Sequence, residues 1–254
     1  MSEERTSVAG QISIVTGAAS GIGRAAALLL ASRGAHVVAL DVNEAGLTSV
    51  VDEINSKGGK ATYKLFDLAS EEKIRATIKE IESEFGRIDS VVNAGGITGP
   101  TGVVTEDISW DAFHETLTVN LFGAIWLTQA VLPLMKERKY GRIVQVASIA
   151  GKEGNPGMSP YNTSKAGLIG YVKGAAKETA PFGIAINALA PAVIRTPIND
   201  ATSEETLKYM IARIPMGRVG EVEEVAEIIA FMASPACSFT TGFTFDISGG
   251  RATY

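Results

Sequence analysis

Short apolar runs alternate along this chain with longer stretches in which apolar residues recur at helical spacing. The short runs are typical of buried strands, and the longer stretches are typical of helices that cover a sheet. The predicted strands are residues 12–15, 36–40, 61–66, 90–92, 142–147, 184–190 and 241–247. The predicted helices are residues 24–33, 44–57, 71–85, 110–139, 161–180 and 222–233, with Pro133 bending or breaking the fourth.

This alternation predicts an α/β fold with a single domain over residues 1–254. Parallel strands need helical crossovers, so we expect a doubly wound, mostly parallel sheet of about seven strands with helices on both faces. The stretch 197–220 is less regular, and we interpret it as a helical flap over the substrate.

The composition excludes several classes of function. The net charge of −5 and the absence of a Lys/Arg cluster argue against a nucleic-acid surface. One cysteine and two histidines argue against a disulfide framework and a structural zinc site. The polar start is unlike a signal peptide, and no apolar run approaches the roughly 20 residues of a membrane span. We therefore expect a cytoplasmic protein without a metal or a membrane partner, whose chemistry comes from an organic cofactor.

The first predicted strand runs into a glycine-rich turn, TGAASGIG at residues 16–23, and then into an Ala/Leu-rich helix. Gly17 can adopt the positive φ of a tight turn. Gly21 and Gly23 have no Cβ, so a pyrophosphate can approach the backbone at the helix N-terminus, where Ser20 adds a hydroxyl. The layout predicts a Rossmann-type dinucleotide site, and the simpler alternative is a turn without a ligand.

Asp41 follows the second predicted strand and indicates which dinucleotide binds. A carboxylate there can accept both ribose hydroxyls of NAD and would repel the 2′-phosphate of NADP. Val42 and Asn43 offer no cation in its place. The sequence therefore predicts NAD as the cofactor, although an aspartate can also simply cap the turn before Glu44.

Small or polar residues stand at the ends of the predicted strands. Because the carboxyl ends of parallel strands meet at one edge of the sheet, we expect these residues to form one cleft. They are Gly17, Asp41, Asp67, Asn93, Ser148 and Pro191.

Three residues near the fifth predicted strand can carry proton transfer. Ser148 ends that strand, and Tyr161 and Lys165 are one helical turn apart, so they share a helix face. A free phenol has a pKa near 10, and we expect the lysine ammonium to lower the pKa of Tyr161 toward neutrality. Ser148 would then hydrogen-bond the substrate oxygen whose proton Tyr161 exchanges. A Tyr/Lys pair at this spacing can also be purely structural.

These features occur together in an order that resembles the short-chain dehydrogenase/reductase family over nearly the whole chain. The matching features are TGAASGIG, Asp41, Asp67, Asn93-Ala94-Gly95, Asn120, Ser148, Tyr161-x-x-x-Lys165 and Pro191-x-x-Ile194-x-Thr196. Val92 and Ala192 depart from it, where the family often has Asn and Gly. Neither departure removes a catalytic group.

The resemblance implies a role for each matching residue. Tyr161 is expected to be the acid/base, Ser148 to orient the substrate oxygen, Lys165 to hold the nicotinamide ribose, and Asn120 to support a water-linked proton path. The expected cofactor contacts are Gly17, Ser20, Gly21, Ile22, Gly23, Asp41, Asp67, Leu68, Asn93, Ala94, Gly95, Tyr161, Lys165, Pro191, Ile194 and Thr196. The implied activity is interconversion of a secondary alcohol and a ketone. A nucleotide-binding sensor without activity is the alternative from another class, and it would not need the four catalytic residues together.

The loops around the site point to the substrate. The stretches 150–156, 191–197 and 246–254 resemble a branch of the family that acts on 2-keto-3-deoxy sugar acids. Lys152, Arg195 and Arg251 could each bind a carboxylate, or each could pair with a surface acid such as Glu153. We expect a small, polar, anionic hydroxy or keto acid, with a 3-oxoacyl-carrier reductase and a polyol or sugar dehydrogenase as alternatives.

Assembly is also suggested by the resemblance. The predicted helix after Tyr161 is rich in small residues, including Gly167, Gly170 and Gly174, which allows close approach of another surface. Packing inside the chain accounts for them equally well. The family commonly uses this helix and the one through Trp110–Met135 in dimer-of-dimers assembly, so we expect a homotetramer or a dimer.

Overall fold

The computed structural model describes residues 6–196 and 204–254, and its strands form one sheet. The strands are β1 (Ile12–Thr16), β2 (His36–Asp41), β3 (Lys60–Leu65), β4 (Ser90–Asn93), β5 (Gly141–Val146), β6 (Ile184–Pro191) and β7 (Thr244–Ile247). The sheet has seven strands in the order β3-β2-β1-β4-β5-β6-β7, and all neighbours pair in parallel. The predicted doubly wound fold is confirmed, and the described sheet is wholly parallel.

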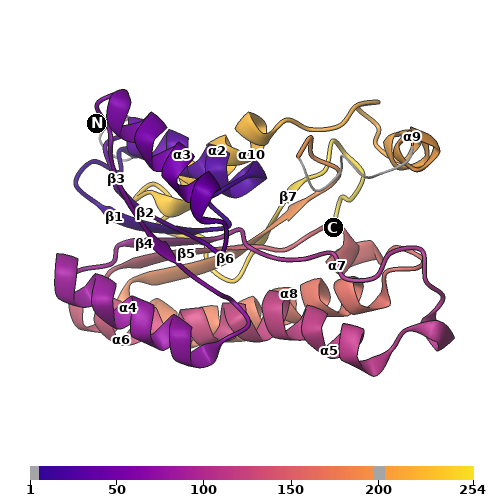
Figure 1. Cartoon of the computed structure of the whole chain (residues 1–254), viewed down its shortest axis with the longest axis horizontal. Coiled ribbons are helices and arrows are strands. Elements are labelled where there is room, and N and C mark those ends of the chain that lie inside the picture. Colours follow the sequence, from indigo (N-terminus) through magenta and orange to yellow (C-terminus); the bar gives the residue numbers. More distant parts are fainter. Residues whose placement is uncertain (1–5, 197–203) are drawn as a thin grey trace.

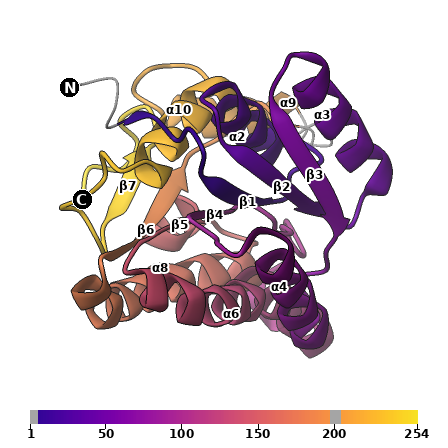
Figure 2. The same ribbon diagram turned by 90° about the vertical axis from the view of Figure 1, so that its left-hand side faces the viewer.

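Helices cover both faces of this sheet (Figures 1 and 2). One layer holds α2 (Gly21–Ser32), α3 (Glu44–Ser56) and α10 (Val222–Ala233), and the other holds α4 (Glu71–Phe85), α6 (Gly123–Arg138) and α8 (Ser159–Thr179). Each layer packs on the sheet through its own apolar cluster, centred on residues such as Leu30 and Leu47 in the first and Ile81 and Leu127 in the second. Burial on both faces explains why the central strands are continuous apolar runs.

The regular helices end where local sequence signals place their ends. In α4, Ser70 accepts a hydrogen bond from the Lys73 N–H at the N-terminus, and Gly86 closes the C-terminus at φ 65°. The helices over residues 71–85 and 222–233 match their predicted bounds. The strand ends agree to within a few residues, with β7 beginning later than expected.

The long predicted helix over residues 110–139 is divided differently from the expectation. It consists of α5 (Trp110–Leu117), the π-helical turn η2 (Thr118–Phe122) and α6. The sequence predicts that Pro133 bends or breaks the helix, but α6 continues through Pro133, so Pro133 does not break it. The irregularity lies instead at η2, where a wider turn carries Asn120.

By length and hydropathy, the described helical stretch Trp110–Arg138 is the one that could cross a membrane. Length and hydropathy alone do not separate a membrane helix from a core helix. Here α6 packs against α4 and β5, and α5 packs against α8. One face of the stretch therefore belongs to the core of the domain.

Three short elements were not predicted by the pattern. They are η1 (Thr105–Asp107) and α7 (Ala150–Glu153), which follow β4 and β5, and η3 (Ala180–Phe182), which lies between α8 and β6. Within the predicted helical flap, α9 (Glu204–Ala212) is a helix. Residues 197–203 of that flap lie outside the described residues.

Candidate active site

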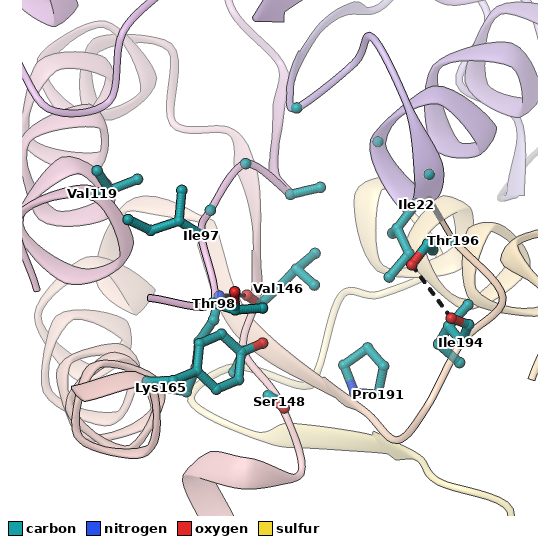
Figure 3. Close-up of a pocket in the computed structure, with 18 of the residues that line it drawn as sticks. Ile22, Ile97, Thr98, Val119, Val146, Ser148, Lys165, Pro191, Ile194 and Thr196 are labelled. Carbon is teal, nitrogen blue, oxygen red and sulfur yellow. Dashed lines mark hydrogen bonds between the residues drawn. The ribbon is translucent and has the colours of Figure 1, made fainter. Parts of the chain in front are cut away.

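A cavity of about 520 Å³ lies at the carboxyl edge of the sheet. The chain leaves β1 toward β2 on one side and reaches β4 on the other, which opens a crevice between them. Figure 3 shows its lining, with Ile22, Ile194 and Thr196 facing Ile97 and Val119 across the opening. The lining includes the ends of β1, β2, β4, β5 and β6, so the predicted convergence of strand ends into one cleft is present.

The glycine-rich turn forms one wall of the cavity. Gly17 has φ 67° and Gly21 has φ 52°, a region that side-chain-bearing residues rarely adopt. A Cβ on Gly23 would overlap the carbonyl oxygen of Gly17, so the helix can begin here only with glycine. Ser20 is the N-cap of α2, yet its side chain makes no capping hydrogen bond and lines the cavity. The hydroxyl and the first N–H groups of α2 are thus available to a phosphate, which fits a dinucleotide.

Asp41 lies at the end of β2, inside the cavity lining. Its carboxylate accepts hydrogen bonds from the backbone N–H groups of Ala19 (3.2 Å) and Asn43 (3.0 Å). These contacts link the end of β2 to the glycine-rich turn and hold the carboxylate beside the phosphate-binding wall. The position fits a ribose diol. The turn-capping alternative describes part of what Asp41 does, because the Asn43 contact is a turn of that kind.

The other expected cofactor contacts divide into two groups. Those that line the cavity are Gly17, Ser20, Gly21, Ile22, Gly23, Asp41, Asp67, Leu68, Ala94, Gly95, Tyr161, Lys165, Pro191, Ile194 and Thr196. Asn93 does not line it. Its amide accepts from the Thr16 hydroxyl (2.6 Å) and donates to Gln145 (2.8 Å), inside the core. Asn93 therefore ties β1, β4 and β5 together and supports the cavity from behind.

Asn120 is likewise absent from the lining. Its side-chain oxygen accepts from the Ile97 N–H (2.8 Å), and its nitrogen donates to the Ile97 carbonyl (2.8 Å) and the Ser164 hydroxyl (3.1 Å). These bonds secure the chain after β4 to α8. A Cβ added at Gly96 would meet both the Asn120 oxygen (2.8 Å) and the Lys165 Nζ (3.6 Å), so Asn120 lies close to Lys165 on the far side of this loop.

Ser148, Tyr161 and Lys165 come together in the cavity. Ser148 follows β5, and the other two lie on the first turns of α8. The Lys165 Nζ lies 5.7 Å from the centre of the Tyr161 ring and donates to the carbonyl of Val146 (2.8 Å). The backbone thus holds the ammonium beneath the tyrosine, with Ser148 on the adjacent wall.

Burial shifts the pKa values of Tyr161 and Lys165. Burial raises the pKa of Tyr161, and the hydrogen bond from Ser148 opposes that rise only in part. Burial also lowers the pKa of Lys165 to about 8. The expected lowering of the Tyr161 pKa is therefore not met in the protein alone, because desolvation is the largest influence on the phenol.

The cations considered for a substrate carboxylate all have acidic partners. Lys152 pairs with Asp246 (2.8 Å), and Arg195 pairs with Glu221 (3.1 Å). Arg251 pairs with Glu153 (2.9 Å), and of the three it alone lines the cavity.

Sequence reasoning missed several lining residues. Asn155 lies in a stretch that the sequence singled out, but no signal marked its side chain. Ile97, Val119, Met158 and Met210 also line the cavity. Isolated apolar residues of this kind carry no pattern that separates a cavity wall from the core.

Comparisons with known proteins agree with this geometry. The family model described as "Enoyl-(Acyl carrier protein) reductase" matches residues 17–252. A 2-dehydro-3-deoxy-L-rhamnonate dehydrogenase (NAD(+)) of Sphingomonas sp. is 42% identical over 247 residues, covering 97% of each chain. A 3-oxoacyl-[acyl-carrier-protein] reductase of Thermotoga maritima is 40% identical over 242 residues, covering 95% of this chain and 97% of that one.

A solved structure of levodione reductase has a TM-score of 0.92 at 30% identity, covering 97% of this chain and 99% of that one. The two sequence relatives extend over almost the full chain, and the solved structure has the same fold throughout. The chain therefore belongs to the short-chain dehydrogenase/reductase family, whose members are nicotinamide-dependent oxidoreductases.

Proposed function

We propose that this protein is an NAD-dependent dehydrogenase that oxidises a secondary hydroxyl of a small anionic sugar acid of the 2-keto-3-deoxy type. The observation that carries the proposal is a pair of polar side chains that line the cavity beyond the catalytic trio. Asn155 and Arg251 line the same cavity as Ser148 and Tyr161, beside apolar residues such as Met158. A small polar substrate satisfies such donors, whereas an acyl chain would leave them unpaired.

The reaction divides between the cofactor and the chain. Bound NAD supplies the hydride acceptor, so that R₂CHOH and NAD⁺ become R₂C=O, NADH and a proton. Tyr161 takes the hydroxyl proton, and Ser148 donates a hydrogen bond to the same oxygen and keeps it in place. Lys165 binds the ribose and supplies positive charge beneath the phenol as it ionises.

Asp41 supports the choice of NAD, and the cellular NAD pool favours oxidation. The similarity to the Sphingomonas enzyme supports a sugar-acid substrate, since that relative is named for both NAD and a 2-keto-3-deoxy sugar acid. The similarity to the Thermotoga maritima reductase keeps a 3-oxoacyl-carrier reductase as the second candidate. That activity would need a long apolar channel and usually uses NADPH.

A substrate panel tests the proposal. Purified protein is assayed with 2-keto-3-deoxy sugar acids, polyols and a 3-oxoacyl thioester, each with both cofactors, at the absorbance of reduced nicotinamide. We expect the sugar acids with NAD to give the highest kcat/KM. Strong turnover of the thioester with none of the sugar acids would overturn the proposal, and no turnover of any substrate would favour the sensor alternative.

The remaining features of the proposal concern the whole molecule. Residues 1–254 act as one cytoplasmic catalytic domain, with 197–220 as a flap over the substrate; Met210, within this stretch, lines the cavity.

The chain assembles as a homotetramer. Supporting this, Gly170 and Gly174 of α8 are exposed with open space where a Cβ would stand, and Trp110 is exposed on α5. A monomer mass in light scattering at micromolar concentration would contradict the assembly.

A further inference from the structure

Two of the three guanidinium nitrogens of Arg251 donate hydrogen bonds within the protein. Its Nε donates to the Glu153 carboxylate (2.9 Å), and its Nη2 donates to the Asn155 side-chain oxygen (3.0 Å). Only 3% of the side chain is exposed, yet the residue lines the cavity. Among the described residues, Nη1 of Arg251 has no hydrogen-bond partner. It is also not one of the fully buried side-chain atoms that lack a partner. Arg251 therefore retains one guanidinium donor, Nη1, that is not used by the described residues at a side chain lining the cavity.

Asn155, which also lines the cavity, carries a second donor. The Asn162 side chain accepts a hydrogen bond from the Asn155 N–H (3.1 Å) and donates one to the Asn155 carbonyl (2.8 Å). A guanidinium has only donors, so the Asn155 atom that faces Arg251 must be the oxygen. The amide nitrogen is then turned away, and it too lacks a partner among the described residues without being a buried unpartnered atom.

The residues that follow Arg251 are held against α7 by contacts of Tyr254 with Lys152. The Tyr254 hydroxyl donates to the Lys152 carbonyl (2.8 Å), and the Lys152 Nζ lies 4.9 Å from the centre of the Tyr254 ring. The Lys152 ammonium also pairs with Asp246. Figure 1 shows the C-terminus beside α7. Arg251 thus reaches the cavity as a fixed group rather than a mobile surface side chain.

We propose that Arg251 and Asn155 bind the carboxylate of the substrate, through donors from Arg251 Nη1 and Asn155 Nδ2. The inference rests on the proposed function and names the residues that bind the anionic end of the substrate. Glu153 moderates the interaction, because its carboxylate offsets part of the guanidinium charge. The pair determines specificity for an acid over a neutral molecule of the same length and takes no part in proton transfer.

The first test compares an acid with its amide. In Arg251→Met, we expect the KM of the 2-keto-3-deoxy sugar acid to rise on the order of 10- to 100-fold, with kcat changed far less. The KM of the corresponding carboxamide and the affinity for NAD should change little. Asn155→Ala should shift the acid in the same direction by a smaller factor, and Arg251→Lys should recover part of the loss.

Arg33→Met is the matched control, since Arg33 forms an ion pair with Glu227 away from the cavity lining. It should leave both KM values unchanged. Thermal melting of each variant shows whether it is folded.

The second test uses a substitution that should lower the KM of the acid instead of raising it. Glu153→Gln retains an acceptor for Arg251 but removes the offsetting charge, so the KM of the acid should fall several-fold while that of the amide stays constant. A purely structural role would raise the KM in both the Arg251 and the Glu153 variants. Equal effects on acid and amide, or an unchanged KM in Arg251→Met, would overturn this inference alone. A wild type that oxidises no sugar acid would overturn the proposed function first.

Discussion

The two ends of the cavity are built in different ways. The phosphate side of the cofactor end is one continuous strand–turn–helix unit, and the Asp41 carboxylate accepts a hydrogen bond from the Ala19 N–H of its turn. The substrate end uses segments far apart in the chain, joined by Arg251 to Asn155 and by Tyr254 to Lys152 across 96 and 102 residues. Local sequence therefore determines the cofactor end, whereas docking of the chain end determines the substrate end. A change in the docked segments can alter the substrate without disturbing the cofactor.

Charge separates the two ends as well. Asp41 lines the cavity, and among the described residues its carboxylate accepts hydrogen bonds from backbone N–H groups alone. At the substrate end, Lys152 and Arg251 each have a carboxylate partner. Under the proposed function, the cofactor end selects through the charge of Asp41, and the substrate end selects through hydrogen bonds from groups whose charge is partly compensated.

The largest effect is expected where the two ends meet. Tyr161→Phe removes the proton acceptor while leaving the ring, so kcat should fall on the order of 10³-fold. Affinity for NAD should stay near that of the wild type, because the variant keeps the aromatic ring and Lys165, the expected ribose contact. Steady-state rates and a fluorescence titration with NADH measure the two quantities. Retention of turnover would refute the role of Tyr161.

Gly23→Ala tests the local construction of the cofactor end. The added Cβ would overlap the Gly17 carbonyl oxygen and lie 2.9 Å from the Thr16 carbonyl oxygen, both in the backbone. We expect a loss of about 3 kcal/mol in the free energy of unfolding together with much weaker NAD binding. Gly174→Ala is the control, since its Cβ meets nothing within 4 Å in the chain. Denaturant melts that place the two variants together would contradict the close packing of this turn.

Lys165→Met tests the buried ammonium through pH. Lys165 has a pKa of about 8 in the folded protein, below the ordinary value of 10.5. Between these values the unfolded chain binds a proton that the folded chain does not, so the free energy of unfolding rises with pH. The wild type should therefore gain on the order of 3 kcal/mol relative to Lys165→Met across this window, and nothing below it. Urea melts of the cofactor-free proteins from neutral to alkaline pH measure this gain, and parallel curves would refute it.

Asp41→Ala tests selection by charge. The wild type should prefer NAD over NADP at least about tenfold in kcat/KM, equivalent to about 1.4 kcal/mol. Without the carboxylate, NAD loses the ribose contacts and NADP is no longer repelled, so the two values should converge. The KM of the substrate serves as the internal control. Equal use of NADP by the wild type would rule out this role of Asp41.

The smallest effect is expected at the docked chain end. Tyr254→Phe removes one exposed hydrogen bond to the Lys152 carbonyl and retains the ring beneath the ammonium. The loss of stability should be about 1 kcal/mol or less, with a slight rise in the KM of the substrate and no change in NAD affinity. A clear loss of NAD affinity in this variant would show that the two ends are not built independently.

The sequence by itself determined the elements, their order and the place of the cleft. Apolar periodicity and capping signals placed the helices over residues 71–85 and 222–233, and a wholly helix-connected sheet must gather its strand ends at one edge. The glycine-rich turn and Asp41 were predictable because their roles depend on residues that are close in the chain.

Only the tertiary structure decided which way side chains turn and what they pair with. Asn93 and Asn120 have the expected positions but direct their amides into the core, and burial raises the pKa of Tyr161, where a neighbouring ammonium had suggested the opposite. The helix runs through Pro133, while the distortion lies at η2. Arg251 has an acidic partner and a neighbour in Asn155 that lie about a hundred residues earlier in the chain. Local sequence carries no information about such contacts, because desolvation and long-range pairing exist only once the layers have packed.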